Sequence, residues 1–170
     1  EKIKHKNTHT QRNIKINKES KSKGLNLKFS VAVHNLVLND EILMGFDSRY
    51  KVLPPLREEA TRKALIEAVL DGTIDCITSD HNPLDIEHKK LEFDLAKDGT
   101  IGLESAFGAL LTILPLEVVV EKLNANKLVF KIENPSIKTE NKADISLFTT
   151  EDNWTFGKEN IVSKSKNSAF

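Results

Sequence analysis

The chain has 170 residues, with 25 basic and 25 acidic side chains, so its formal net charge is zero. This balance gives no reason to expect nucleic acid or an anionic membrane as a partner. No apolar stretch reaches the ~18 residues of a membrane span and no secretory signal is recognisable, so we expect a cytoplasmic protein without a membrane partner.

The first part of the chain predicts a helix and then a strand. Residues 1–12 are basic, polar and without periodicity, and residues 14–23 favour a short basic helix that ends at Gly24. Residues 25–38 alternate at first and then become continuously apolar, which is typical of a strand whose end leaves a barrel. Asn39 is placed to cap a short helix directly after this strand.

A second helix and a second strand follow. Residues 58–70 carry apolar side chains at helical spacing, and Gly72 suits the left-handed position just after a helix end. Residues 74–79 form a short apolar run that is typical of a buried strand. Cys76, the one cysteine of the sequence, lies inside this run and suits a buried side chain in a reducing compartment better than a disulfide.

The most informative segment comes at the end of this strand and reads Ser79-Asp80-His81-Asn82-Pro83. In α/β barrels the catalytic residues lie at the C-terminal ends of strands, and the loops after them hold the substrate. Pro83 ends the strand and stiffens the turn, which limits the motion of the Asp80 side chain. The alternative interpretation is that Asp80 only caps a turn.

The remaining sequence predicts a long loop, two helices and a change of character. Residues 80–100 have no periodicity, and loops of this length in compact domains are usually functional or mobile. Residues 102–113 and 115–123 favour helices on an outer ring. From Ala125 onward a polar turn leads into one expected strand at residues 142–148, which is typical of the edge of a β domain.

Three blocks of sequence, in this order and spacing, resemble the dihydroorotases of the amidohydrolase superfamily, in particular their long-chain bacterial type. The blocks are PPLR at 54–57, DGTIDCITSDHNP at 71–83 and GTIGLESAFGALL at 99–111. The resemblance implies an α/β fold, with the C-terminal part of a TIM-like (β/α)8 metal-dependent hydrolase barrel over residues 1–124. Residues 125–170 are then a return segment toward a small β-sandwich domain.

A complete barrel of this kind needs ~250 residues. The chain shows about two strand–helix units, so we expect it to be a fragment of a longer protein or to rely on strands supplied from elsewhere. The His-x-His pair that relatives carry on their first strand is absent from this sequence.

The resemblance implies interconversion of N-carbamoyl-L-aspartate and L-dihydroorotate in pyrimidine synthesis, with a small-molecule substrate and zinc as the cofactor. In the family, zinc activates a water molecule, and a carboxylate at the end of the last barrel strand takes and returns its proton. By position, Asp80 is that metal ligand and general acid/base. His81, its neighbour, is expected to point the opposite way and to support the site rather than bind metal.

Two further histidines occupy positions of interest. His34 lies where relatives show a His-His pair, and we expect it to make a hydrogen bond at a strand tip. Another metal-ligand histidine of the family falls on Asn7. His5 and His9 flank Asn7 at the spacing that keeps side chains on one face of a strand, and His9 is the candidate ligand. The alternative is that both are solvated histidines in a basic leader.

The substrate contacts depart further from the family. Leu53 replaces an asparagine and Leu84 replaces a histidine that holds the substrate carboxylate, and each lost hydrogen bond costs ~1–3 kcal/mol. His88 and the two lysines after it are candidates to bind that carboxylate, although a solvated charge cluster is the alternative. The backbone at Asp98 and Gly99 matches a family stretch whose main chain contacts the pyrimidine ring, and glycine permits close approach.

Three functions therefore stay open. The first is a zinc-dependent cyclic amide hydrolase of dihydroorotase type. The second is a catalytically silent subunit that acts as a scaffold, either as a homodimer or beside aspartate carbamoyltransferase. The third is a hydrolase of hydantoinase or allantoinase type, whose ring lacks the carboxylate. For the 170-residue chain alone we expect no turnover, because its metal cage is incomplete.

Overall fold

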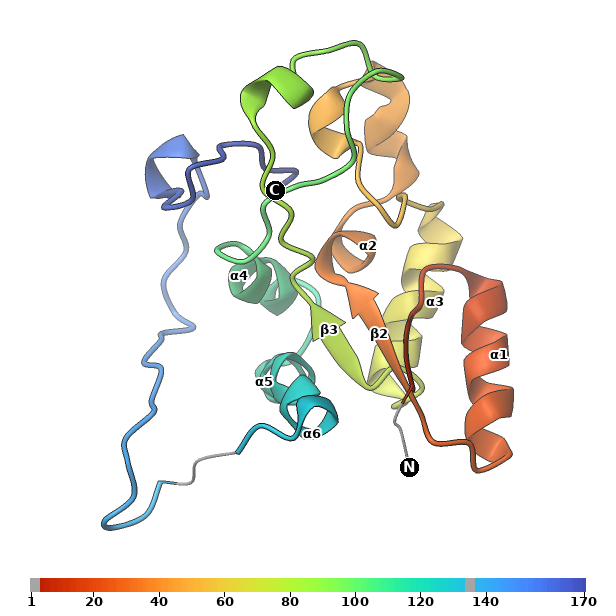
Figure 1. Cartoon of the computed structure of the whole chain (residues 1–170), viewed down its shortest axis with the longest axis vertical. Helices are drawn as coiled ribbons and strands as arrows, with labels where there is room; N and C mark the ends of the chain where they lie inside the picture. Colours follow the sequence, from red (N-terminus) through yellow and green to blue (C-terminus); the bar gives the residue numbers. More distant parts are fainter. Residues whose placement is uncertain (1–3, 134–136) are drawn as a thin grey trace.

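The computed structural model describes residues 4–133 and 137–170. At its centre is a parallel sheet of three strands in the order β1-β2-β3 (Figure 1). The described strands all run in the same direction: β1 (Lys4–Asn7), β2 (Leu27–Ala32) and β3 (Cys76–Thr78). Since parallel neighbours need long crossover connections, this sheet already implies helices between its strands.

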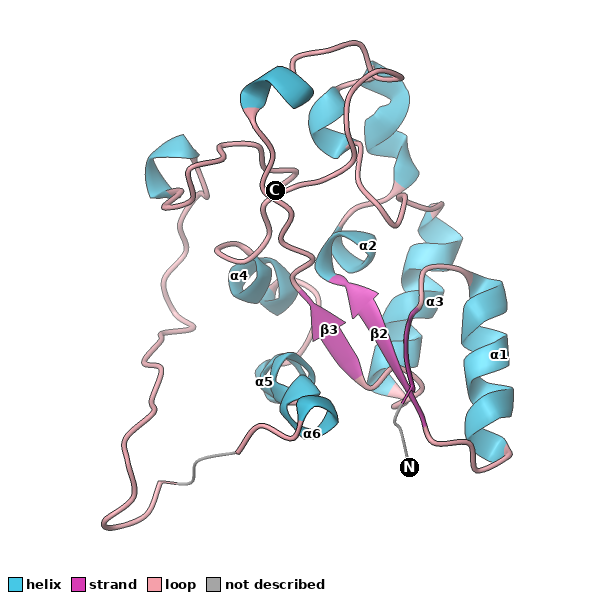
Figure 2. Ribbon diagram, viewed as in Figure 1, coloured by secondary structure: helices cyan, strands magenta, loops and turns pink. Residues whose placement is uncertain are grey.

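The helices of the two crossovers are present where the sequence predicted them. α1 (Gln11–Ser22) joins β1 to β2, and α3 (Glu59–Leu70) lies in the longer connection from β2 to β3 (Figure 2). The Thr10 side chain accepts a hydrogen bond from the Asn13 backbone N–H at 3.1 Å, and this cap starts α1 earlier than residue 14. The α/β class is thereby confirmed.

The strand predicted over residues 25–38 is shorter than expected. β2 ends at Ala32, and a short helix, α2 (Val33–Val37), follows it directly. His34 therefore lies on a helix and not on a strand tip, and its Nε2 is 3.1 Å from the backbone oxygen of Pro54. The apolar pattern missed this change because a short buried helix and a buried strand look alike in sequence.

Short 3-10 helices occupy the connections above the sheet. The first, η1 (Asp40–Gly45), is capped by Asn39, whose side chain accepts from the Glu41 backbone N–H at 3.2 Å, as predicted. The others in these connections are η2 (Ser48–Tyr50) and η3 (Ile86–His88). The long loop over residues 80–100 is thus mostly irregular, as its sequence indicated.

The hydrophobic core lies between the sheet and the helices around it. α4 (Ala106–Leu111) falls within the first predicted helical segment, α5 (Leu116–Asn124) matches the second to within one residue, and α6 (Asn126–Phe130) follows them. Strands and helices contribute side chains that are almost completely buried: Val31, Val33, Leu36, Leu65, Ile77, Leu110 and Val119. These contacts hold the C-terminal ends of β2 and β3 in place, where the candidate site lies.

The strand predicted at residues 142–148 is not formed. This stretch runs without strand pairing along the outside of the molecule, and Leu147 in it is 98% exposed (Figure 1). A strand needs a neighbouring strand for its backbone hydrogen bonds, and none lies beside this segment among the described residues. After η4 (Lys158–Asn160), residues 161–170 return to the barrel part, so the division at residue 125 stays a prediction.

A partly buried charge cluster lies at the N-terminal edge of the sheet. The Asp75 carboxylate accepts hydrogen bonds from the Phe29 backbone N–H at 2.9 Å and from Lys21 Nζ and Lys28 Nζ at 3.0 Å each. Burial acts to raise the pKa of the Asp75 carboxyl, but these three donors outweigh it and hold the pKa below its ordinary value. Beside it, burial raises the pKa of the Cys76 thiol to about 11.

No helix in the described part of the chain is long and apolar enough to cross a membrane.

Candidate functional site

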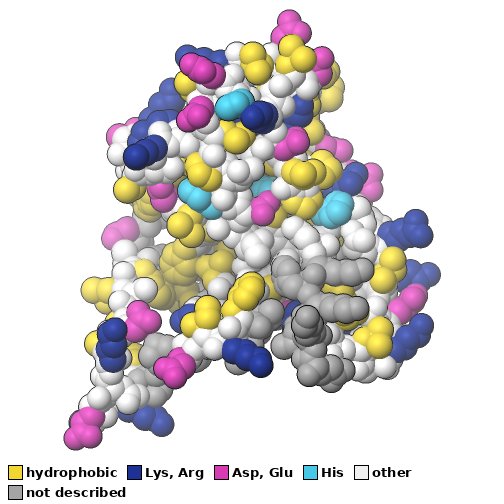
Figure 3. Space-filling view, viewed as in Figure 1, with side chains coloured by type: hydrophobic (Ala, Val, Ile, Leu, Met, Phe, Trp, Pro, Cys, Tyr) yellow, Lys and Arg dark blue, Asp and Glu magenta, His cyan; other side chains and the backbone are white. Residues whose placement is uncertain are grey.

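The candidate site lies at the C-terminal edge of the sheet, where the three parallel strands end side by side. β1 ends at Asn7 and leads to His9, β2 leads through Ala32 to His34, and β3 leads to Asp80. In the space-filling view, histidine side chains lie across the middle and upper parts of the face shown (Figure 3). The order of strands thus brings residues that are far apart in sequence to one edge, as the barrel prediction requires.

Asp80 takes an uncommon backbone conformation at the end of β3. Its φ is +49°, in the left-handed region that residues with a side chain rarely adopt, and the residue is half-buried. The Asp80 carboxylate lies close enough to His34 to favour the protonated form of that imidazole. Asp80 is therefore half-buried at the rim, with its carboxylate within electrostatic reach of a buried histidine. Strained conformations of this kind persist only where the surroundings enforce them.

His34 is enclosed below this rim. It is 1% exposed, and burial lowers the pKa of its imidazole, although Asp80 and the hydrogen bond with Pro54 act in the opposite direction. With Nε2 donating to the Pro54 oxygen, the Nδ1 atom is left without a partner. The neutral ring therefore keeps a buried acceptor without a partner below the rim.

His9 lies at the end of the neighbouring strand. Its Nδ1 is buried and has no hydrogen-bond partner, and burial followed by the charge of Arg57 lowers the pKa of its imidazole. Asn7, the position of the expected family ligand, is exposed. The side chain of His5 is outside the described set, so its prediction as an alternative ligand is not addressed.

Unpartnered polar atoms gather at this edge of the sheet. Of the six buried side-chain atoms without a partner in the described residues, four lie here: His9 Nδ1, His34 Nδ1, Asn35 Oδ1 and Arg57 Nε. Buried polar groups are normally satisfied, and each exception needs an explanation such as a ligand, an ion or water. Their grouping makes this edge the best candidate for a binding site in the described part of the molecule.

His81 points away from this rim. Its Nδ1 accepts the backbone N–H groups of Gly102 at 3.3 Å and Leu103 at 3.2 Å, so that nitrogen is unprotonated. Gly102 also lies against the backbone oxygen of Ser79, where a Cβ atom would have no room. The ring thus ties the turn after β3 to the segment that leads into α4, and its supporting role toward a metal site stays a prediction.

Asp98 and Gly99 have their backbone groups engaged within the protein. Gly99 has φ +146°, and a Cβ there would come within 2.7 Å of the Asn82 amide nitrogen. Its N–H donates to the Lys51 oxygen at 3.0 Å, and its oxygen accepts from Asn167 at 3.0 Å. The Asp98 oxygen accepts from Asn82 at 3.3 Å. The close approach that glycine permits is therefore made by Asn82, and a contact of this backbone with a ring stays a prediction.

The cluster that begins at His88 is only partly solvated. Lys89 is 3% exposed, and its Nζ donates to the Lys51 oxygen at 3.1 Å and to the Lys97 oxygen at 2.9 Å. Burial lowers the pKa of this ammonium group. Lys89 therefore fastens the loop over residues 80–100, whereas His88 is half-buried and Lys90 is exposed. The role of His88 toward a substrate carboxylate stays a prediction.

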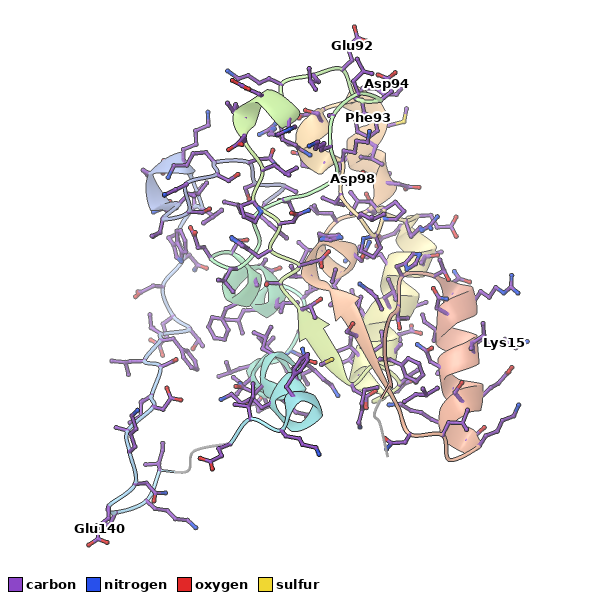
Figure 4. All side chains as sticks on the ribbon, viewed as in Figure 1. Lys15, Glu92, Phe93, Asp94, Asp98 and Glu140 are labelled. Carbon is purple, nitrogen blue, oxygen red and sulfur yellow. The ribbon has the colours of Figure 1, made fainter. Side chains whose placement is uncertain are left out.

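The outer part of that loop is remote from the strand ends. Figure 4 shows Glu92, Phe93 and Asp94 at the tip of the loop, with Asp98 on the limb that returns toward the sheet. Asp98 is exposed, and its side chain makes no hydrogen bond given for the described residues. The role of the Asp98 side chain toward a substrate therefore stays a prediction.

The two leucines at the expected substrate positions lie in different surroundings. Leu53 is 65% exposed next to Pro54. The backbone N–H and oxygen of Leu84 are both bound to the Ser165 hydroxyl, at 3.3 Å and 2.7 Å. Sequence analysis missed Ser165, and with it the whole C-terminal contribution to this edge, because a polar segment without periodicity carries no signal for a contact so distant in sequence.

The described residues do not complete a metal site. No three side chains of the His, Cys, Asp and Glu types come close enough to one another to hold an ion in residues 4–133 and 137–170. A protein zinc site uses three or four such ligands. Asp80 and His9 could therefore provide part of a site but not all of it.

Comparison with known proteins adds the family context. No protein-family model matches the chain. It is 38% identical over 168 residues to a dihydroorotase of Caldicellulosiruptor saccharolyticus and 36% identical over 168 residues to a dihydroorotase of Bacillus subtilis. Each alignment covers 95% of this chain and 39% of the relative, so the chain spans about two fifths of the length of the curated relatives it matches.

Solved structures support the fold. An L-hydantoinase of Arthrobacter aurescens superimposes with a TM-score of 0.69 at 22% identity, over 76% of this chain and 31% of that one. An inactive dihydroorotase-like domain of the Chaetomium thermophilum CAD-like multifunctional protein superimposes with a TM-score of 0.58 at 22% identity, over 80% and 43% of the two chains. These matches confirm the predicted part of a TIM-type amidohydrolase barrel. Along nearly all of its length, this stretch is therefore similar in sequence to part of the dihydroorotases, and its fold is that of part of an amidohydrolase barrel.

Proposed function

We propose that the protein is a cyclic amide hydrolase of dihydroorotase type, which interconverts N-carbamoyl-L-aspartate and L-dihydroorotate in pyrimidine synthesis. One observation carries this proposal: half-buried Asp80 directly follows the C-terminal end of β3, at the same edge of the sheet as the buried His34. The names of the sequence relatives support the same reaction.

Opening or closing the ring needs one group that can both accept and donate a proton. A carboxylate fixed at the rim suits this task, because the same oxygen can take the proton of an attacking water and return it to the leaving ring nitrogen. Asp80 is that general acid/base in our proposal. The unprotonated Nδ1 of His34 lies below it and can accept a hydrogen bond from the water or from the protonated carboxyl.

Zinc is the proposed cofactor, and Asp80 and His9 are its proposed ligands from this chain. Since these residues do not complete a cage, the other ligands must come from sequence that this chain does not contain. The 170-residue chain by itself is accordingly expected to have no turnover. A homodimer, an association with aspartate carbamoyltransferase and a cytoplasmic location stay predictions.

The test uses the encoded protein at its full length. We expect it to form L-dihydroorotate from N-carbamoyl-L-aspartate, and we expect Asp80→Asn to lower kcat/KM by at least ~100-fold, because the proton acceptor is lost. Asp85→Asn is the matched control, since Asp85 is exposed on the same loop and should retain activity. Equal activity of Asp80→Asn and the wild type would remove Asp80 from the mechanism.

A silent scaffold is the second candidate, and specific observations favour it. Leu53 and Leu84 replace two groups that bind substrate in the family, and Asn7 stands where a metal ligand is expected. Losing two hydrogen bonds of ~1–3 kcal/mol each weakens binding by a factor on the order of 100 or more. A full-length protein that binds no zinc and turns over neither dihydroorotate, hydantoin nor allantoin would establish this candidate instead.

A further inference from the structure

The last ten residues of the chain lie along the loop that borders the candidate site. We call residues 161–170 the C-terminal strap. At one end, the backbone N–H groups of Val162 and Ser163 each donate to the Glu104 carboxylate at 2.8 Å. At the other end, the Phe170 side chain packs against the main hydrophobic core. The strap is thus anchored on both sides of the segment that it crosses.

Asn167 is the central contact of the strap. It is 4% exposed, its Nδ2 donates to the Gly99 oxygen at 3.0 Å, and its own backbone oxygen accepts from the Ile101 N–H at 2.9 Å. Next to it, the Ala169 N–H donates to the Thr100 hydroxyl at 2.8 Å. Three successive residues of the loop, 99 to 101, are therefore held from one side by the strap.

The opposite side of this loop segment holds the turn that carries Asp80. The Asn82 N–H donates to the Thr100 oxygen at 2.8 Å, and His81 accepts the Gly102 N–H. The loop segment 99–102 is thus bound to the strap on one side and to residues 81 and 82 on the other. A shift of the strap should therefore also shift the turn that carries Asp80. Asp80 needs such support, because a left-handed backbone conformation costs free energy in a residue with a side chain and persists only where neighbouring contacts impose it.

We propose that Asn167 is a positioning residue of the site. Through the Gly99 oxygen it fixes residues 99–102, and these in turn hold the turn that presents Asp80 at the end of β3. The catalytic part of this inference rests on the proposed function, whereas the mechanical part rests only on the contacts. Removing the Asn167 amide leaves the buried Gly99 oxygen without its donor, so the segment must loosen.

The mechanical part is tested by hydrogen–deuterium exchange of the full-length protein. We expect Asn167→Ala to raise backbone exchange by about tenfold in peptides that cover residues 79–83 and residues 99–103, and not in α1. Asn153→Ala, in the exposed tail, is the matched control and should leave all three unchanged. Faster exchange in residues 99–103 alone, or in α1 as well, would overturn the inference.

A second variant covers the case in which Asn167→Ala fails to fold. Thr100→Val keeps the shape of the side chain but removes the acceptor for the Ala169 N–H, and it should raise exchange in the same two peptides by a smaller factor. Unchanged exchange in either peptide would contradict the proposal.

The catalytic part is tested by kinetics. We expect Asn167→Ala to lower kcat about tenfold, because it misplaces the acid/base, and to raise KM by a smaller factor than the loss in kcat, because it also loosens the Gly99 backbone. A change in KM alone would assign Asn167 to binding and overturn the positioning role. If the wild type has no turnover, the proposed function fails, while the exchange experiment still decides whether the strap positions Asp80.

Discussion

The two edges of the small parallel sheet are built in opposite ways. At the N-terminal edge, Asp75 is matched with two ammonium groups and a backbone N–H, so each oxygen of its carboxylate is used. At the C-terminal edge, His9, His34 and Arg57 each keep a buried polar atom without a partner. The Asp75 carboxylate at the N-terminal edge thus has its hydrogen-bond partners within the protein. The buried polar atoms at the C-terminal edge do not, and a ligand, an ion or water could bind them.

The difference indicates that the N-terminal edge stabilises the fold and that the C-terminal edge is suited to binding a ligand. Buried polar groups without partners cost free energy, so they are retained where something else can bind them. In barrels the C-terminal face carries the chemistry and the opposite face carries stability. Even this partial barrel shows the division, since β3 separates the paired charges at one edge from the polar atoms without partners at the other. Mutations at the N-terminal edge should therefore lower the free energy of unfolding. Mutations at the C-terminal edge should instead weaken ligand binding and leave the free energy of unfolding almost unchanged.

The largest effect is expected at the satisfied edge. Asp75→Ala should lower the free energy of unfolding by about 1–2 kcal/mol, because it removes the acceptor of the buried Phe29 N–H and the partner of two partly exposed ammonium groups. Urea unfolding measures this loss. Asp144→Ala in the exposed tail is the matched control, and we expect a change below about 0.5 kcal/mol there. If Asp75→Ala lowers the free energy of unfolding no more than the control does, the N-terminal edge does not have the stabilising role that we assign to it.

A smaller effect is expected from acid. Because the pKa of folded Asp75 is below that of the unfolded carboxyl, the folded state binds its proton less readily. The stability that Asp75 contributes is therefore fully present above the unfolded pKa of about 3.9 and is lost as the pH falls through the lower folded value. Urea unfolding between pH 7 and pH 2 should show the wild type converging on Asp75→Ala only below about pH 4. A difference that stays constant over that range would exclude the carboxylate as its source.

The satisfied edge and its strands were largely predictable from the sequence. Helices α1 and α3 were predicted from apolar periodicity and helix-end signals. Strand β3, which begins at Cys76, was predicted from a short apolar run before a proline turn. The same reasoning placed Asp80 at a strand end. Local patterns suffice here because each element is defined by residues near one another in the chain.

The other edge was less predictable, for physical reasons. α2 was missed because a run of five residues, four of them buried, can form either a strand or a helix turn. Asn167 and Ser165 were missed because their partners are 68 and 81 positions away and nothing in the local pattern marks them. The strand expected at residues 142–148 had the right composition and lacked a neighbour.

The smallest effect on stability is expected at the unsatisfied edge, and it is the sharpest test of the comparison. His9→Phe removes a buried nitrogen that has no partner, so the free energy of unfolding should stay within about 0.5 kcal/mol of the wild type. The same change should weaken zinc binding by the full-length protein at least about tenfold, measured by titration with the metal alone, because a proposed ligand is lost. His88→Phe, on the loop, should alter zinc binding by less than about twofold. A loss of stability above about 1 kcal/mol with zinc binding unchanged would make His9 a structural residue, and the unpaired atoms at this edge would then need another explanation.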